Sequence, residues 1–242
     1  MESPDEIRRS APRRVDQIDV GGAVLACLAD VHGNTAALDA VLGSEEFARA
    51  SAVAFLGCTT TGPDPLGVLE RCADLKIPVF HLAGNGERLV LEFASGVRPV
   101  KREVDEFLVA AHGDAGLATI GSWPGGLRAI HRPAGGLRMC RGSPRSDVEL
   151  LTTLTGDDRL RAATAGVDEA VVIHGHSPEA KTADAEKLVF SNEPPARTAC
   201  GLPGCLAGRP HACCGEPQTG ERADHADECP DVMAVHAARL AE

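Results

Sequence analysis

An aspartate and a histidine two residues apart, Asp30 and His32, directly follow a short aliphatic run in this 242-residue chain. The run, residues 24–29, predicts a buried strand. In extended backbone, residues two apart point to the same side, so a carboxylate and an imidazole would lie together. Such a pair suits Zn, Mn or Fe. The alternative is a helix-capping aspartate beside a surface histidine, so the pair alone does not establish a metal site.

Aliphatic runs alternate with helical patterns through the first half of the chain. The runs cover residues 24–29, 52–56 and 77–82. The β-α-β-α-β-α order predicts a parallel α/β sheet, in which functional residues gather where strands end. Asp30, Cys58 and Asn85 each follow one of these runs. We therefore expect the three side chains to meet at one edge of the sheet.

The second half of the chain is less regular. Residues 127–131 and 137–140 predict a hairpin, and residues 170–174 and 187–190 predict two further strands. Helices are expected at residues 103–111, 146–154 and 231–240.

Five blocks in order resemble the motifs of the bacterial single-domain calcineurin-like metallophosphoesterases. They are Asp30-Val31-His32-Gly33-Asn34, Phe55-Leu56-Gly57-Cys58, Leu82-Ala83-Gly84-Asn85-Gly86-Glu87-Arg88, Arg141-Gly142-Ser143-Pro144 and Gly175-His176-Ser177-Pro178. The match spans roughly residues 22–195. It implies a layered α/β/β/α sandwich and a metal-dependent phosphoric ester hydrolase.

The chain departs from this family at positions where the resemblance implies two metal ions bridged by an aspartate. Cys58 stands at the bridging position, and Arg141 stands where the fourth block has a histidine. Gly86 replaces the residue that assists the leaving group, and Pro178 replaces the last histidine of the fifth block. A two-metal site needs an anchor common to both ions. We therefore expect at most one tightly held divalent ion.

That ion is expected to be Zn, Fe or Mn. Its ligands would come from Asp30, His32, Cys58, Asn85 and His176. A thiolate at Cys58 would favour a soft ion. The other reading makes Cys58 a small buried apolar residue, which is what free cysteine most often is. His174, two residues before His176, is expected to pack beside the site, with ligation as the alternative.

Arg141 and Glu87 are the candidate catalytic residues. The Arg141 guanidinium can bind a phosphate bidentately, or it can simply exclude a second ion. Glu87 can protonate a leaving oxygen if its pKa is raised. The alternative for Glu87 is a solvated glutamate at the start of a helix.

The composition narrows the choice of partners. The formal net charge is −11, which disfavours nucleic-acid binding, and we find no stretch that would span or target a membrane. Hydrophobic residues make up 43% and aromatic residues 3%, so the core must be built mainly from Val, Leu, Ile and Ala. We expect a cytoplasmic protein with reduced cysteines and a small phosphorylated substrate or ligand.

Three regions are expected. Residues 1–19 form a flexible N-terminal arm, residues 20–195 the metallophosphoesterase-like domain, and residues 196–242 a Cys-rich, mostly irregular tail that ends in a short helix. Five of the nine cysteines lie in the tail. Their spacing leaves open a metal site, a flexible acidic tail, and a redox or partner contact.

The sequence thus predicts hydrolysis of a small phosphomonoester or phosphodiester with a bound divalent metal. Two alternatives stay open because so many ligand positions are replaced. One is a non-catalytic descendant that binds a ligand or a protein partner, and the other is a repurposed mononuclear metal site.

Overall fold

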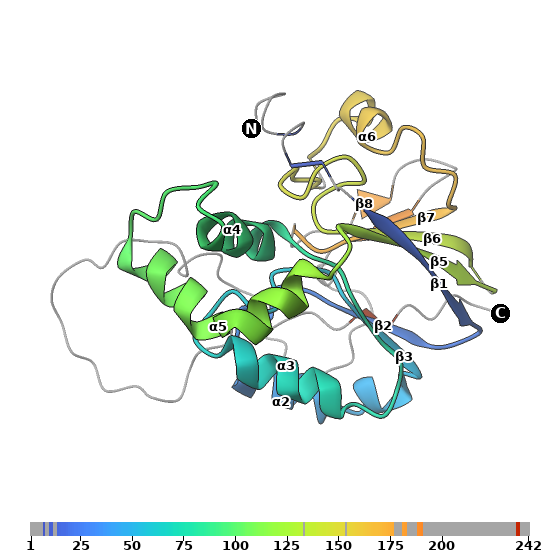
Figure 1. The fold of residues 1–242 in the computed structure, drawn as a ribbon. Coiled ribbons are helices and arrows are strands. Elements are labelled where there is room, and N and C mark those ends of the chain that lie inside the picture. Colours follow the sequence, from blue (N-terminus) through green and yellow to red (C-terminus); the bar gives the residue numbers. More distant parts are fainter. Residues whose placement is uncertain are drawn as a thin grey trace, which may run out of the picture.

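The computed structural model describes residues 7, 10–11, 14–132, 134–152 and 154–176, and the strand positions 181–182, 188–190 and 236–237. Two β-sheets pack face to face with helices outside them, which confirms the predicted layered α/β sandwich (Figure 1). Within the described part, no helix combines the length and apolar character that a membrane span requires.

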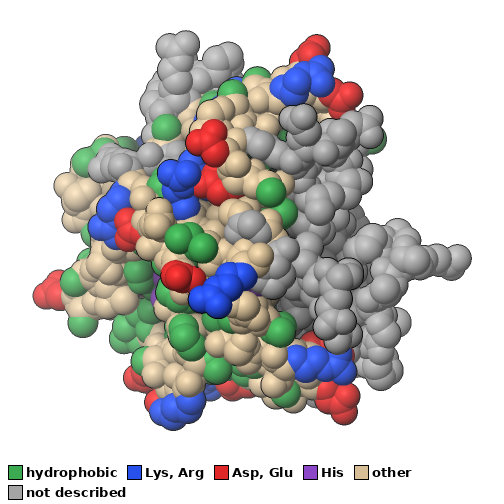
Figure 2. Space-filling model, turned by 90° about the vertical axis from the view of Figure 1, so that its right-hand side faces the viewer, with side chains coloured by type: hydrophobic (Ala, Val, Ile, Leu, Met, Phe, Trp, Pro, Cys, Tyr) green, Lys and Arg blue, Asp and Glu red, His purple; other side chains and the backbone are tan. Residues whose placement is uncertain are grey.

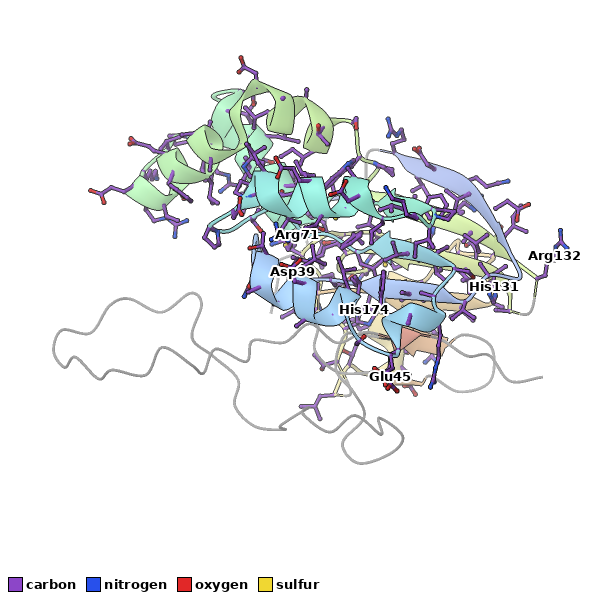
Figure 3. All side chains as sticks on the ribbon, turned by 90° about the horizontal axis from the view of Figure 1, so that it is seen from below. Asp39, Glu45, Arg71, His131, Arg132 and His174 are labelled. Carbon is purple, nitrogen blue, oxygen red and sulfur yellow. The ribbon has the colours of Figure 1, made fainter. Side chains whose placement is uncertain are left out.

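The smaller sheet contains the three strands predicted from the first aliphatic runs. These are β2 (Leu25–Leu28), β3 (Ala52–Phe55) and β4 (Val79–His81), all parallel. Strand β10 (His236–Ala237) pairs antiparallel with β2. The outer face of this sheet packs against α2 (Thr35–Leu42), the short 3-10 helix η1 (Phe47–Arg49) and α3 (Pro65–Asp74). An ion pair between Asp39 and Arg71 links α2 to α3 (Figure 3).

The larger sheet has the order β1-β5-β6-β7-β9-β8. Its strands are β1 (Val15–Gly21), β5 (Gly126–His131), β6 (Gly135–Cys140), β7 (Val171–His174), β8 (Lys181–Thr182) and β9 (Leu188–Phe190). Strands β5 and β6 form the predicted antiparallel hairpin. The outer face packs against α6 (Asp157–Ala163) through an apolar cluster that includes Leu160 and Val172.

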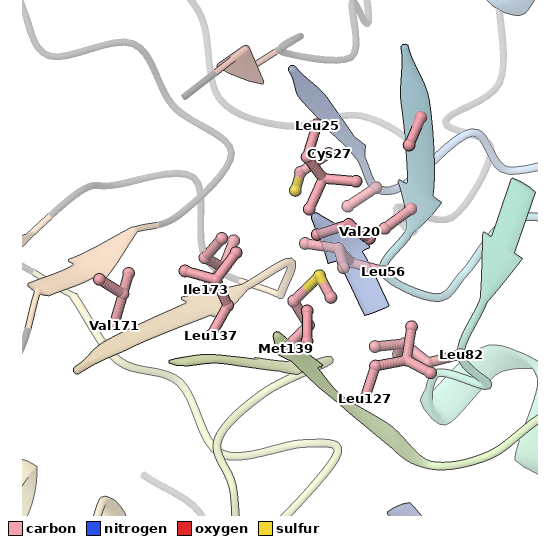
Figure 4. Close-up of a cluster of buried hydrophobic side chains, with 14 residues drawn as sticks. Val20, Leu25, Cys27, Leu56, Leu82, Leu127, Leu137, Met139, Val171 and Ile173 are labelled. Carbon is pink, nitrogen blue, oxygen red and sulfur yellow. The ribbon is translucent and has the colours of Figure 1, made fainter. Parts of the chain in front are cut away.

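The main core lies between the two sheets and is aliphatic, as the composition predicted. Leu25 and Cys27 of the smaller sheet face Leu137, Met139 and Ile173 of the larger one (Figure 4). These side chains are at most 6% exposed. Because the core joins the sheets, the loops that follow β2, β3, β6 and β7 are held against one another.

Two further helices flank the end of the sandwich. Helix α4 (Asn85–Ala94) packs against α5 (Glu103–Gly121), which bends at Gly113, where φ is 56°. Just after α5, the Trp123 ring stacks on His81 with centroids 4.4 Å apart. Acidic and basic side chains lie interspersed over the described part of the face in Figure 2.

Three sequence-based expectations differ from the structure. Residues 15–19 of the expected arm belong to β1, an edge strand in which the exposed Gln17 and Asp19 alternate with the more buried Ile18 and Val20. Residues 146–154 are not helical in their described part, and α6 was not predicted. Of the expected helix 231–240, the structure describes only residues 236–237, which are strand. The rest of that helix, and the cysteines of the tail, lie outside the described residues.

Side-chain hydrogen bonds explain why residues 146–152 form a loop. The Ser146 hydroxyl accepts hydrogen bonds from the N–H groups of Val148 and Glu149, which competes with helix formation. The fully buried Glu149 carboxylate then accepts from Arg145, Arg159 and the Ser143 hydroxyl. This network anchors the segment that follows β6.

We predict that Glu149→Gln destabilises the protein at pH 7 by about 1–3 kcal/mol, because buried donors lose their acceptor. Burial raises the pKa of Glu149, but hydrogen bonds from Arg145 and Ser143 outweigh it and keep the pKa below its usual value. A lowered pKa stabilises the fold above about pH 4.3, and this contribution is lost as the pH falls. The free energies of unfolding of the wild type and of Glu149→Gln, measured in urea, should converge as the pH falls from 7 to 3. The exposed control Glu106→Gln should change the free energy of unfolding little.

Candidate metal centre

Two loops, one after β2 and one after β3, are joined by backbone hydrogen bonds. The Asp30 N–H donates to the Gly57 carbonyl at 3.2 Å, and the His32 N–H donates to the Cys58 carbonyl at 2.9 Å. A Cβ atom on Gly62 would lie only 1.6 Å from the His32 carbonyl oxygen. The close approach of the loops therefore requires glycine at this position.

The backbone is strained where these loops meet. Asp30, His32 and Cys58 have φ values of 58°, 49° and 50°, and they are the non-glycine residues of the described chain with positive φ. Each such conformation costs about 1–3 kcal/mol and persists only when its surroundings enforce it. The same three residues offer ligand atoms that all lie within 4.8 Å of one another. The strain thus coincides with three of the five predicted ligand positions.

Asp30 and His32 are in direct contact. The His32 Nε2 atom lies 3.0 Å from Asp30 Oδ1, and its Nδ1 atom lies 3.2 Å from the Thr61 carbonyl oxygen. Burial lowers the pKa of His32, but the hydrogen bond and the charge of Asp30 outweigh it, so the pKa is raised. Because Nε2 faces a carboxylate oxygen, it is the donor in this contact, and an ion binding there would have to displace its proton.

Arg141 makes the most extensive contacts in the site. Its guanidinium donates to both oxygens of Asp30, from Nη1 at 2.7 Å and from Nη2 at 2.5 Å. Nη1 also donates to the Gly175 carbonyl, and Nε donates to Asn85 Oδ1 at 3.2 Å. Arg141 is only 3% exposed. Burial raises the pKa of Asp30, but the Arg141 charge and hydrogen bonds from His32 and Arg141 hold it well below its usual range.

Cys58 is a buried thiol in this arrangement. Its Sγ atom donates to Asn85 Oδ1 at 3.3 Å. Burial raises the pKa of Cys58 to about 12, although the Arg141 charge opposes the rise. Only a thiolate binds a metal well, so an ion at Cys58 would have to displace this proton too.

Glu87 is fully buried, and its carboxylate organises the loop after β3. It accepts hydrogen bonds from the N–H groups of Cys58, Thr59, Thr60 and Gly84 at 2.7 to 3.0 Å. A carboxylate that accepts several N–H hydrogen bonds is poorly placed to donate a proton to a leaving group. The role of Glu87 as a catalytic acid stays a prediction. Nor is Glu87 the solvated glutamate of the alternative reading. The preceding Gly86 leaves no space, because a Cβ atom there would lie 2.7 Å from Thr61.

The two remaining candidate histidines lie at the end of strand β7. His174 is its last residue, and His176 follows two residues later. His174 is 1% exposed, and its Nδ1 atom has no hydrogen-bond partner. Burial lowers the pKa of His174 to about 3, and His176 and Arg141 add to this effect. His176 follows Gly175, whose carbonyl contacts Arg141, but it does not join the group formed by Asp30, His32 and Cys58.

Three donors in the described part of the chain lie close enough together to hold a metal ion. Asp30, His32 and Cys58 offer a carboxylate, an imidazole and a sulfur, which suit Zn or Fe. The Arg141 guanidinium bonds to Asp30 and Asn85, two acceptors of the predicted ligand set. The sequence indicated that an arginine replaces a histidine in the fourth block. It could not indicate which side chains this arginine contacts.

Comparisons with solved structures support the fold. A metallophosphoesterase from Sphaerobacter thermophilus is 20% identical with a TM-score of 0.52, over 70% of this chain and 75% of that one. A candidate diadenosine tetraphosphatase is 15% identical with a TM-score of 0.44, over 76% of this chain and 87% of that one. The E. coli phosphoesterase YfcE is 19% identical with a TM-score of 0.39, over 69% of this chain and 77% of that one. No family model and no curated protein matched the chain. On the first of these structures, the chain has the metallophosphoesterase fold.

We predict that Glu87→Gln destabilises the protein by about 1–3 kcal/mol, because an amide NH₂ group would face backbone N–H donors. The measurement is the free energy of unfolding in urea at pH 7. Glu70→Gln, at an exposed position of α3, is the matched control and should change stability little. Equal stability of the two variants would contradict the role of Glu87 in holding the loop.

Proposed function

We propose that this chain is a phosphoesterase that hydrolyses a small phosphomonoester or phosphodiester with one divalent ion held by Asp30, His32 and Cys58. The observation that carries the proposal is the convergence of these three donors within 4.8 Å on strained loops of a metallophosphoesterase fold. Strained backbone is concentrated at functional sites, where it pre-organises side chains. The ion would supply a bound water of lowered pKa and a positive charge for a phosphate oxygen.

The residues around the donors have separate tasks. Asn85 accepts hydrogen bonds from both Cys58 and Arg141, so it fixes the thiol relative to the guanidinium. Arg141 donates to both oxygens of Asp30 and so orients its carboxylate. In this geometry Arg141 acts on a bound phosphate through its charge and through Asp30, whereas direct bidentate contact would require it to leave Asp30.

A substrate for this site must carry its own negative charge and be small. The net charge of −11 disfavours a nucleic-acid backbone, which would be repelled over the whole surface. A phosphate group close to Arg141 and an ion would be attracted locally, because nearby charges dominate over distant ones. We therefore propose small phosphorylated molecules as the substrate class.

One observation favours a second candidate, a non-catalytic protein of the same fold. Both oxygens of Asp30 are bonded to Arg141, and the Cys58 thiol is held as a neutral donor. A ligand or a protein partner could then use the site without hydrolysis. Elemental analysis after purification separates the candidates, since this one predicts far less than one equivalent of metal per chain.

We predict that the purified protein hydrolyses a generic aryl phosphate monoester or diester when Mn, Zn, Fe or Ni is supplied. Asp30→Ala should lower the rate at least about 100-fold, because it removes a ligand of the ion. The matched control is Asp39→Ala, which removes an exposed carboxylate from α2 and should keep the activity.

Initial rates at fixed metal concentration provide the measurement. Turnover that survives Asp30→Ala would show that the hydrolysis arises elsewhere. The absence of turnover with every ion, together with substoichiometric metal, would favour the non-catalytic candidate.

A further inference from the structure

We infer that the Arg141 guanidinium is a built-in cation that takes the place of a metal ion at the strand ends. It donates to acceptors from three separate elements: Asp30 after β2, Asn85 at the start of α4, and the Gly175 carbonyl after β7. A divalent ion collects oxygen ligands from converging loops in the same way. Here a side chain of the protein makes those contacts, through four hydrogen bonds.

The surroundings are shaped to hold this side chain. A Cβ atom on Gly57 would lie 2.6 Å from the Gly84 Cα atom and 3.1 Å from the Arg141 Cδ atom. Glycine at these two positions therefore lets the two loops meet backbone to backbone beside the arginine stem. The Arg141 backbone is also fixed, because its carbonyl accepts from the Gly175 N–H at 2.9 Å. A guanidinium that is buried, enclosed and bonded on several sides is a fixed part of the site.

The charges around Arg141 leave little attraction for a second cation beyond the one proposed at Asp30, His32 and Cys58. Asp30 and Arg141 compensate each other, and the Asn85 amide oxygen already accepts from the Cys58 thiol and from Arg141 Nε. The Glu87 carboxylate is turned to backbone N–H groups of the loop. An ion entering beside Arg141 would meet a like charge at close range in a poorly solvated place. The guanidinium thus excludes a second ion from the position where it bonds to Asn85 and to the Gly175 carbonyl.

This inference goes beyond the proposed hydrolysis, because it concerns which cation organises the acceptors. Its test compares chelator-treated full-length wild-type protein with Arg141→Ala. The probe is Mn²⁺ alone, and the readouts are titration calorimetry and the thermal unfolding midpoint. We expect Arg141→Ala to bind Mn²⁺ at least about tenfold more tightly than wild type, because the repulsion is gone and acceptors are freed. Mn²⁺ should also raise its unfolding midpoint by more than it raises that of wild type.

Three further variants make the result specific. Arg141→Lys keeps the positive charge and should bind Mn²⁺ no more tightly than wild type. Arg71→Ala removes an exposed arginine that pairs with Asp39, and it should leave Mn²⁺ affinity unchanged. In the double variant Asp30→Asn with Arg141→Ala, the gain in affinity should disappear.

The outcomes are decisive even if Arg141→Ala folds poorly. Recovery of its native circular dichroism on addition of Mn²⁺, without recovery in the double variant, supports the inference. Equal Mn²⁺ affinity in wild type and Arg141→Ala, or a variant that stays unfolded with Mn²⁺, overturns it. Failure of the proposed function is distinguishable, because it would appear as missing hydrolysis in the wild type whatever the variants bind.

Discussion

The bidentate ion pair between Arg141 and Asp30 joins the two sheets at their functional edge. It links the loop after β2 to the loop after β6, across 111 positions of the sequence. Through the Gly175 carbonyl and Asn85, the same guanidinium also reaches the loop after β7 and the start of α4. A buried charge is tolerated only when it is paired and hydrogen-bonded. The position of each of these loops is therefore tied to the others.

A second buried carboxylate, Glu87, holds the loop after β3 in a shape that it would not adopt alone. It gathers the N–H groups of Cys58, Thr59 and Thr60, while the neighbouring loop bonds to the same segment from the other side. The positive φ of Cys58 is kept by these contacts. Arg141 and Glu87 thus organise the site from within, one by its positive charge and the other by its negative charge.

The fold and the chemistry of this chain have to be considered separately. The layered sandwich is that of a metallophosphoesterase, and its strand ends still bring Asp30, His32 and Cys58 together. The centre of the site, however, contains a guanidinium and a neutral thiol. A fold supports many chemistries, and the side chains at its strand ends decide among them. Metal content and metal affinity are consequently the properties most directly connected to what this protein does.

Local patterns in the sequence determined the strands β2, β3 and β4, the β5–β6 hairpin and the alternation with helices, because periodicity and burial are local properties. They also placed the candidate residues at strand ends. Tertiary structure alone decided the partners of Arg141 and Glu87, since these depend on loops from distant positions that meet at one edge. It also decided that residues 146–152 form a loop, because the buried Glu149 requires donors from Arg145 and Arg159.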